Sequence, residues 1–186
     1  MLIDTLGILI TAVLSGARLH QLLRGEWWVL PLFLHAAISV ILLLTRTNTN
    51  KKATMLQQAV AWLSALSPFA VQVQHEIPLI LRALSLAGVV FAVWTLIVLG
   101  KSFDVSPADR GLVERGPYQW MRHPMYASEI FSTIVIVAAD LSMWNMLVTA
   151  TMLVTIILRI RWEEAIISGY AGYSDRVRAR LFPGVW

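Results

Sequence analysis

Residues 77–100 read IPLILRALSLAGVVFAVWTLIVLG, and this stretch contains a single charged side chain, Arg82. About 20 mostly apolar residues in a helix are enough to cross the hydrocarbon core of a bilayer. Arg82 lies near the start of the stretch, where a long side chain can reach the polar interface. The stretch therefore predicts a membrane-spanning helix, and the rest of the fold is interpreted outward from it.

The whole chain is also rich in apolar residues and poor in charged ones. Of its 186 residues, 58% are hydrophobic and 14% are charged, whereas soluble domains average about 25% charged residues. A soluble domain of this length would need more polar residues to cover its surface. Three further apolar stretches, at residues 2–23, 27–45 and 53–73, complete a prediction of four membrane spans.

The second half of the sequence is organised differently. Residues 101–124 form the longest polar segment and are expected outside the hydrocarbon. Residues 126–158 are apolar but are interrupted by Asp140, Ser142 and Asn145, which predicts a helical hairpin. The basic tail, residues 159–186, is expected at the interface or in the cytosol. The predicted fold class is all-α, a polytopic membrane helical bundle in one domain, 1–186, with N-terminal spans in 1–100 and a polar loop, hairpin and tail in 101–186.

Charge predicts the orientation. If the apolar segments alternate across the bilayer, nearly all lysines and arginines of the connecting segments and the tail fall on one side. Such residues are enriched on the cytoplasmic side, so both termini and the polar loop are expected in the cytosol. The net charge of +4 then reflects topology and contact with anionic membrane lipids, and no nucleic-acid partner is expected.

The run GLVERGPYQWMRHPMY, residues 111–126, is the first candidate for chemistry. Gly116 and Pro117 bend the chain, while Pro124 favours extended geometry at His123 and can begin the next helix. A bent segment that enters a helix offers backbone groups to a small polar ligand. The alternative is an ordinary arginine-rich loop between membrane helices.

A second candidate group follows the last apolar stretch, where Arg159, Glu163 and Glu164 occur. An ionisable residue at membrane depth is costly and indicates a functional site. Arg159 and Glu163 are four residues apart, so they share one face of a helix. The alternative is a surface ion pair with arginines that extend to the interface.

Several other chemistries are not supported. The sequence contains no cysteine, which excludes disulfides, zinc–cysteine sites and a cysteine nucleophile. Its four histidines lack metal-ligand spacing, so no metal site is expected. No glycine-rich nucleotide-binding loop is present, and a nucleoside cofactor must be held in another way.

In order and spacing, residues 111–126, the apolar hairpin and the pair Glu163-Glu164 resemble the isoprenylcysteine carboxyl methyltransferase and phospholipid methyltransferase superfamily. The resemblance covers roughly the C-terminal half of the chain. It implies an integral membrane enzyme that uses S-adenosyl-L-methionine, with a cofactor cleft built by the loop and the tail at the cytosolic face.

The resemblance also implies roles for individual residues. Arg159 occupies the place of an arginine associated with substrate in the prenylcysteine enzymes. Two positions depart from the family: Arg110 replaces a frequent histidine, and no glutamine occurs near Phe103, so cofactor contact there is not implied. The residues expected to contact the cofactor are Leu112, Val113, Tyr118, His123, Pro124, Met125, Tyr126 and Glu163.

The expected reaction is methyl transfer to a lipophilic acceptor, first of all the carboxylate of an isoprenylcysteine-like molecule. Arg159 would hold an anionic acceptor. A phospholipid amine or a lipid phenol or thiol is the alternative acceptor. An amine or a phenol would need a base, for which His123 and Glu164 are the candidates. A small membrane transporter is the non-enzymatic alternative. Partners are expected to be a lipid or prenylated substrate and membrane lipids.

Overall fold

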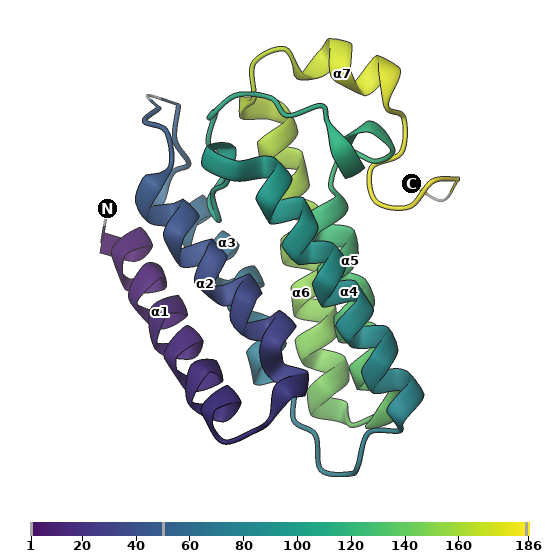
Figure 1. Ribbon diagram of the computed structural model, residues 1–186. Helices are drawn as coiled ribbons and strands as arrows, with labels where there is room; N and C mark the ends of the chain where they lie inside the picture. Colours follow the sequence, from purple (N-terminus) through teal and green to yellow (C-terminus); the bar gives the residue numbers. More distant parts are fainter. Residues whose placement is uncertain (1, 50, 185) are drawn as a thin grey trace.

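Antiparallel helices packed side by side make up most of the computed structural model, which describes residues 2–49, 51–184 and 186. Both termini lie toward the same end of the bundle, where a long loop and the last helix also gather (Figure 1). The α-helices are α1 (Leu2–Leu23), α2 (Leu30–Thr45), α3 (Met55–Leu66), α4 (Leu79–Leu99), α5 (Pro124–Ala139), α6 (Met143–Ile166) and α7 (Tyr170–Arg176). Short 3-10 helices are η1 (Trp27–Val29), η2 (Ser67–Ala70), η3 (Gly100–Ser102) and η4 (Gly116–Gln119).

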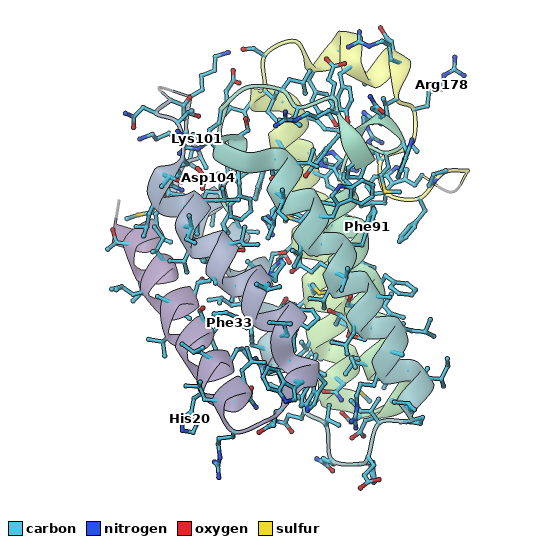
Figure 2. The ribbon with its side chains drawn as sticks, viewed as in Figure 1. His20, Phe33, Phe91, Lys101, Asp104 and Arg178 are labelled. Carbon is cyan, nitrogen blue, oxygen red and sulfur yellow. The ribbon has the colours of Figure 1, made fainter. Side chains whose placement is uncertain are left out.

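The helical segments confirm a polytopic helical membrane protein. The described residues contain four helices that are long and apolar enough to cross a bilayer: Ile3–Leu23, Trp27–Thr45, Leu79–Ser102 and Met143–Ile166. Polar and charged residues gather at the two ends of the bundle, with Lys101, Asp104 and Arg178 at one end and His20 at the other (Figure 2). Large apolar side chains such as Val13, Leu44 and Ile97 are exposed on the outer surface, as expected of helices that face lipid.

The third predicted span, residues 53–73, is shorter in the structure. Thr54 caps α3 in a capping box with Gln57, and Pro68 lies in the 3-10 turn that follows the helix. The α-helix therefore has 12 residues, fewer than a typical span. One face of α3 packs against the protein, where Ala61, Trp62 and Ser64 are buried, while Leu56 and Leu63 on another face are exposed.

The predicted hairpin is present, but its second helix is longer than expected. Ser142 caps the start of α6 by accepting a hydrogen bond from the Asn145 backbone N–H. The helix then continues past Leu158 to Ile166, a length of 24 residues. The charge of Arg159 does not end it, because Arg159 and Ile160 are buried against other protein segments and do not face lipid.

Two hydrophobic clusters of buried side chains meet at the start of α5. One joins α2, α3, α4 and the loop after α4, through residues that include Leu43, Trp62, Leu96 and Phe103. The other joins α5, α6 and the segment that follows α6, residues 167–186, which is called the tail from here on. This second cluster includes Ile130, Ile156 and Leu181. Met125 packs against both clusters. The start of α5 therefore lies where the two halves of the chain meet.

Candidate active site

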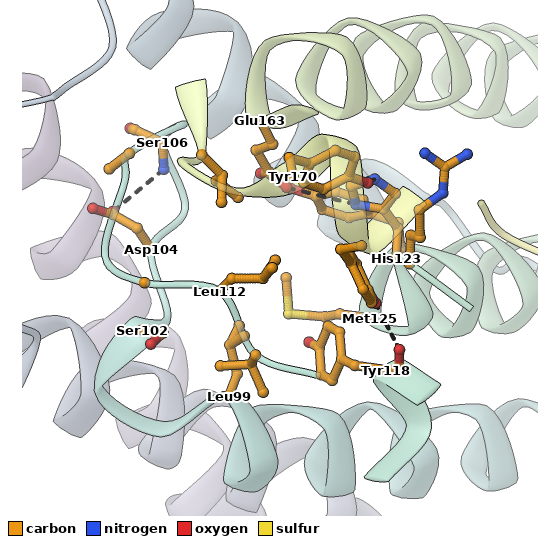
Figure 3. Close-up of a pocket in the computed structure, with 17 residues that line it drawn as sticks. Leu99, Ser102, Asp104, Ser106, Leu112, Tyr118, His123, Met125, Glu163 and Tyr170 are labelled. Atoms are coloured by element: carbon orange, nitrogen blue, oxygen red, sulfur yellow. Dashed lines mark hydrogen bonds and ion pairs between the residues drawn. The ribbon is translucent and has the colours of Figure 1, made fainter. Parts of the chain in front are cut away.

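A pocket lies at this junction, between the loop after α4, the start of α5, the end of α6 and α7 (Figure 3). Its walls combine apolar side chains, four tyrosines and several charged groups. The lining residues are Leu99, Ser102, Asp104, Ser106, Ala108, Gly111, Leu112, Val113, Tyr118, Arg122, His123, Met125, Tyr126, Glu163, Ile167, Tyr170 and Tyr173.

Most of the residues expected to contact a cofactor meet in this pocket. Leu112, Val113, Tyr118, His123, Met125, Tyr126 and Glu163 all line it. Three residues expected to take part in binding or catalysis do not: Pro124, which is fully buried at the start of α5, Arg159 and Glu164. The first candidate group therefore shares one pocket with Glu163, the member of the second group that lines it.

Glycines shape the loop. Gly111 has φ +96° and Gly116 has φ +58°, a backbone region that other residues rarely adopt. A Cβ at Gly116 would lie 3.1 Å from a methyl group of Val98, so the loop passes close to α4 there. These turns place Leu112 and Tyr118 on the pocket wall.

Tyr126 and Glu163 bring α5 and α6 together at the pocket. The Tyr126 hydroxyl donates a hydrogen bond to the Glu163 carboxylate. His123 lies near the other oxygen of this carboxylate, with Nδ1 3.7 Å from Oε2. The rings of His123 and Tyr126 are stacked, with centroids 5.7 Å apart. A carboxylate is thus held at the pocket wall between an aromatic hydroxyl and an imidazole.

Glu164 faces a different set of partners. Its carboxylate accepts hydrogen bonds from Arg180 (3.0 and 3.1 Å) and from the Tyr170 hydroxyl (3.1 Å). Arg122 and the Nε2 atom of His123 also lie close to it, at 3.2 and 3.3 Å. Glu164 therefore joins the loop, the end of α6 and the tail.

The tail covers one side of the pocket. The backbone N–H of His123 donates to the carbonyl of Arg180 at 2.9 Å, and the Tyr173 hydroxyl donates to the carbonyl of Tyr118 at 2.6 Å. Burial raises the pKa of Tyr118, Tyr170 and Tyr173 above the usual range. All three phenols therefore stay protonated well above neutral pH, and Tyr170 and Tyr173 act as hydrogen-bond donors to Glu164 and to the carbonyl of Tyr118.

Arg159 lies behind Tyr126, outside the pocket lining. Its side chain is 1% exposed, and its guanidinium carbon lies 4.6 Å from the centre of the Tyr126 ring. Nη2 donates to the carbonyl of Val105 at 2.9 Å, but Nε and Nη1 have no hydrogen-bond partner. Glu129 of α5 is near enough to interact with Arg159 electrostatically.

Sequence reasoning missed several residues of the site. Asp104 and Ser106 line the pocket from the loop, and Tyr170 and Tyr173 line it from the tail. Two tyrosines three residues apart in a polar tail were a usable signal, because they share one face of a helix. Glu129, a single carboxylate within an apolar stretch, was another.

The departure at Arg110 also has a structural explanation. Its side chain is 4% exposed and pairs with Asp104, with Nη2 2.7 Å and Nε 2.8 Å from Oδ2. Arg110 thus points to a carboxylate of the pocket wall and fixes the backbone immediately before Gly111.

Comparison with known proteins supplies a family. The sequence model described as phospholipid methyltransferase matches residues 77–171, slightly more than half of the chain. No curated protein matches the chain. The matched region contains α4, the pocket loop, α5, α6 and Tyr170, while α1, α2 and α3 lie outside it.

Proposed function

Because the chain belongs to the phospholipid methyltransferase family and is therefore a membrane methyltransferase, we propose that its pocket binds S-adenosyl-L-methionine and that its acceptor is a lipophilic molecule held beside Arg159. The observation that carries the proposal is the convergence of Tyr118, His123, Tyr126 and Glu163 on one pocket at the polar end of a multi-pass bundle.

The charged groups of the pocket fit this cofactor. Arg122 lines the pocket, and its buried Nε has no hydrogen-bond partner, so it can donate to the carboxylate of the methionine moiety. Glu163 can accept from the amino group of the same moiety. A cation and an anion in one pocket match the two charges of an amino acid.

The uncharged walls fit the remainder of the cofactor. Leu99, Leu112, Val113 and Met125 provide apolar surface for an adenine ring. The face of Tyr118 can attract a sulfonium by cation–π interaction, on the order of 0.5–2 kcal/mol. When bound, S-adenosyl-L-methionine supplies a methyl group on a positively charged sulfur.

The residues of this chain contribute mainly alignment and exclusion of water. Methyl transfer needs no nucleophilic side chain, so positioning can supply much of the acceleration. The tail that carries Tyr170 and Tyr173 covers the pocket. Its proposed role is to keep water away from the reacting groups.

Arg159 is proposed to hold the acceptor. A buried guanidinium with two unpartnered N–H groups is costly, and Nε and Nη1 of Arg159 are such groups. An anionic group of the acceptor would satisfy both donors. The first candidate acceptor is the carboxylate of an isoprenylcysteine-like molecule, which needs no base because it is already ionised.

A second candidate acceptor is a phospholipid amine. The family description and the carboxylate of Glu129 beside Arg159 favour it, since a phosphate could pair with Arg159 and an amine with Glu129. An amine must lose a proton, and His123 lies in the pocket as the candidate base. The proposed role of Glu164 is to hold the tail, because its carboxylate accepts hydrogen bonds from Arg180 and Tyr170.

Labelling the methyl group tests the function and separates the acceptors. Purified protein would be incubated with S-adenosyl-L-methionine carrying a labelled methyl group and with lipid extracts, and the labelled lipid would then be treated with mild base. Base-labile label indicates a carboxyl ester, and base-stable label on nitrogen indicates an amine. No transfer to any lipid, together with no binding of S-adenosylhomocysteine, would refute the proposal.

The pocket is proposed to face the cytosol, because the lysines and arginines gather at its end of the bundle. The chain has no cysteine, so a single introduced cysteine can be labelled without background. Arg115 near the pocket and Glu76 at the opposite end are both exposed. Arg115→Cys should be protected from an impermeant reagent in intact cells and Glu76→Cys labelled; the reverse pattern would overturn this orientation.

A further inference from the structure

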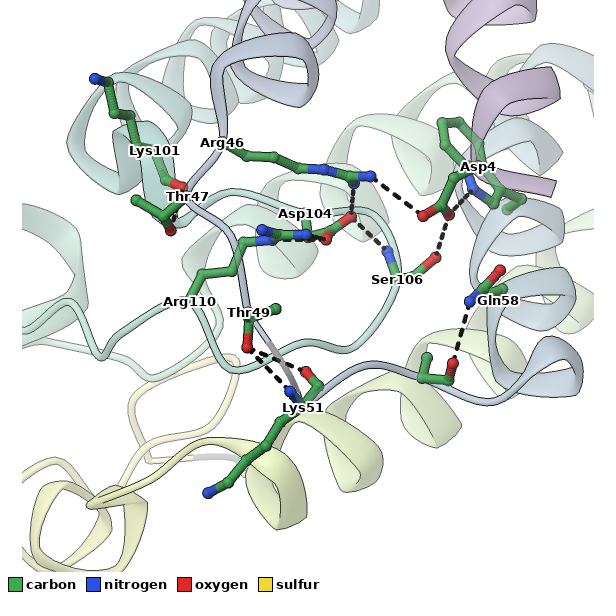
Figure 4. A network of polar contacts seen from close by, with 12 residues as sticks. Asp4, Arg46, Thr47, Thr49, Lys51, Gln58, Lys101, Asp104, Ser106 and Arg110 are labelled. Atoms are coloured by element: carbon green, nitrogen blue, oxygen red, sulfur yellow. Dashed lines mark hydrogen bonds and ion pairs between the residues drawn. The ribbon is translucent and has the colours of Figure 1, made fainter. Parts of the chain in front are cut away.

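A network of four charged side chains adjoins the pocket and includes a residue of the first helix (Figure 4). Asp4 of α1 accepts a hydrogen bond from Arg46 at 3.2 Å, and Arg46 also pairs with Asp104. Asp104 in turn pairs with Arg110 at 2.7 Å. Acidic and basic groups alternate along this chain of contacts, so its formal charges cancel.

The network is shielded from water. The side chains of Asp104 and Arg110 are 7% and 4% exposed, and those of Asp4 and Arg46 are each 18% exposed. Charges held in such surroundings interact strongly, and removal of one leaves its partner without compensation. A change at Asp4 must therefore affect Arg46 and Asp104.

Asp4 has two further contacts that fix its position. Its Oδ1 atom accepts hydrogen bonds from Trp62 Nε1 at 3.2 Å and from the Ser106 hydroxyl at 3.1 Å. Gly7, one helical turn away, lets α1 approach Trp62 closely, because a Cβ at Gly7 would lie 2.2 Å from the indole. The carboxylate of Asp4 thus joins α1, α3 and the pocket loop.

The other end of the network leads directly into the pocket wall. Asp104 and Ser106 line the pocket, as do Gly111, Leu112 and Val113, which follow Arg110. The Ser102 hydroxyl donates to the carbonyl of Arg110 at 3.1 Å and holds the same point of the backbone. The network therefore determines where the segment 110–113 lies.

We propose that Asp4 is a positioning residue of the cofactor pocket, which acts through Arg46 and Asp104 on the segment 110–113. The affinity for the cofactor then depends on a helix outside the region that matches the family, residues 77–171. This inference rests on the proposed binding of S-adenosyl-L-methionine in the pocket.

The test compares two carboxylates at opposite ends of the bundle. Asp140 is a suitable control, because it is 8% exposed and accepts hydrogen bonds from the backbone of residues 74 and 75, far from the pocket. Asp4→Asn should raise the Kd for S-adenosylhomocysteine and the cofactor KM roughly ten-fold, with the acceptor KM unchanged. Asp140→Asn should leave this Kd within about two-fold of wild type even where it lowers the melting temperature.

Two further measurements distinguish positioning from general loosening of the fold. Asp4→Asn and Arg110→Gln should be less than additive in their effect on the Kd, because both interrupt one network. Trp62→Phe keeps an aromatic ring but removes one donor to Asp4, and it should weaken binding roughly three-fold. This variant decides the question if Asp4→Asn does not fold.

Each outcome has one meaning. Wild-type protein that binds S-adenosylhomocysteine, with unchanged affinity in folded Asp4→Asn or Trp62→Phe, would overturn the role of Asp4 and leave the proposed function standing. Equal weakening by Asp4→Asn and Asp140→Asn would overturn it as well. Wild-type protein that does not bind S-adenosylhomocysteine would refute the proposed function and this inference together.

Discussion

The hydroxyl of Tyr126 on α5 donates a hydrogen bond to the carboxylate of Glu163 on α6, although the two residues are 37 positions apart. Both line the pocket. Tyr126 thus contributes its hydroxyl to the carboxylate and its aromatic face to the guanidinium of Arg159 behind it. One side chain connects the proposed cofactor pocket with the proposed acceptor site.

Removing this hydroxyl should weaken cofactor binding. Tyr126→Phe keeps the ring but leaves the Glu163 carboxylate without that donor, so the Kd for S-adenosylhomocysteine should rise about five-fold. Glu163→Gln loses a charge-assisted contact to the ligand, about 1.5–3 kcal/mol or roughly ten- to a hundred-fold. Calorimetric titration of both variants checks this. Full additivity in the double variant would show that the two residues act separately.

Arg159 should affect the acceptor and not the cofactor. Arg159→Ala is expected to lower kcat/KM for the acceptor by roughly ten- to a hundred-fold, the loss of about 1.5–3 kcal/mol for a charge-assisted contact. The affinity for S-adenosylhomocysteine should stay within a few-fold of wild type. Arg161→Ala is the matched control, since Arg161 is exposed on the same helix. Equal loss of cofactor affinity in Arg159→Ala and Glu163→Gln would refute this division of roles.

The tail should depend on Glu164 for its stability. Glu164→Gln removes the charge that Arg122 and Arg180 both contact, so unfolding should become easier by about 1.5–3 kcal/mol. Glu114→Gln interrupts a pair with Arg176 whose side chains are 41% and 60% exposed, and an exposed pair contributes only about 0–1 kcal/mol. Denaturant unfolding in detergent checks the difference. Two equal effects would contradict the proposed role of Glu164.

Stability should also depend on the protonation of Asp109. Hydrogen bonds from Ser168 hold the pKa of this carboxyl below its usual range, which is about 3.9 in an unfolded chain. The stabilisation is therefore complete above that value and is lost as the pH falls through the lower pKa of the folded state. Between pH 6 and pH 3, the melting temperature should fall less in Asp109→Asn than in wild type. Asp175→Asn, at an exposed residue of α7, is the control, and identical pH dependence in all three proteins would contradict the prediction.

The sequence predicted the fold class and, through the family resemblance, seven of the seventeen residues that line the pocket. Apolar stretches of span length can only be helices in a bilayer, because every backbone polar group must be satisfied internally. The order of motifs in residues 111–126 and the pair Glu163-Glu164 pointed to two segments that contribute residues to the pocket. Local spacing also predicted that Arg159 and Glu163 share a face.

Only the tertiary structure decided where these elements end and what they contact. The hydropathy pattern predicted that the last apolar helix ends before Arg159. In the structure, α6 continues to Ile166, because Arg159 is buried inside the protein. Glu164 pairs with Arg180 of the tail, and Asp4 is connected to Arg110 through other charged side chains. Both sets of contacts join residues that are distant in sequence. A charged residue has no intrinsic preference among partners of opposite sign. The packing of the helices determines which partner lies within a few ångströms, where the interaction is strong.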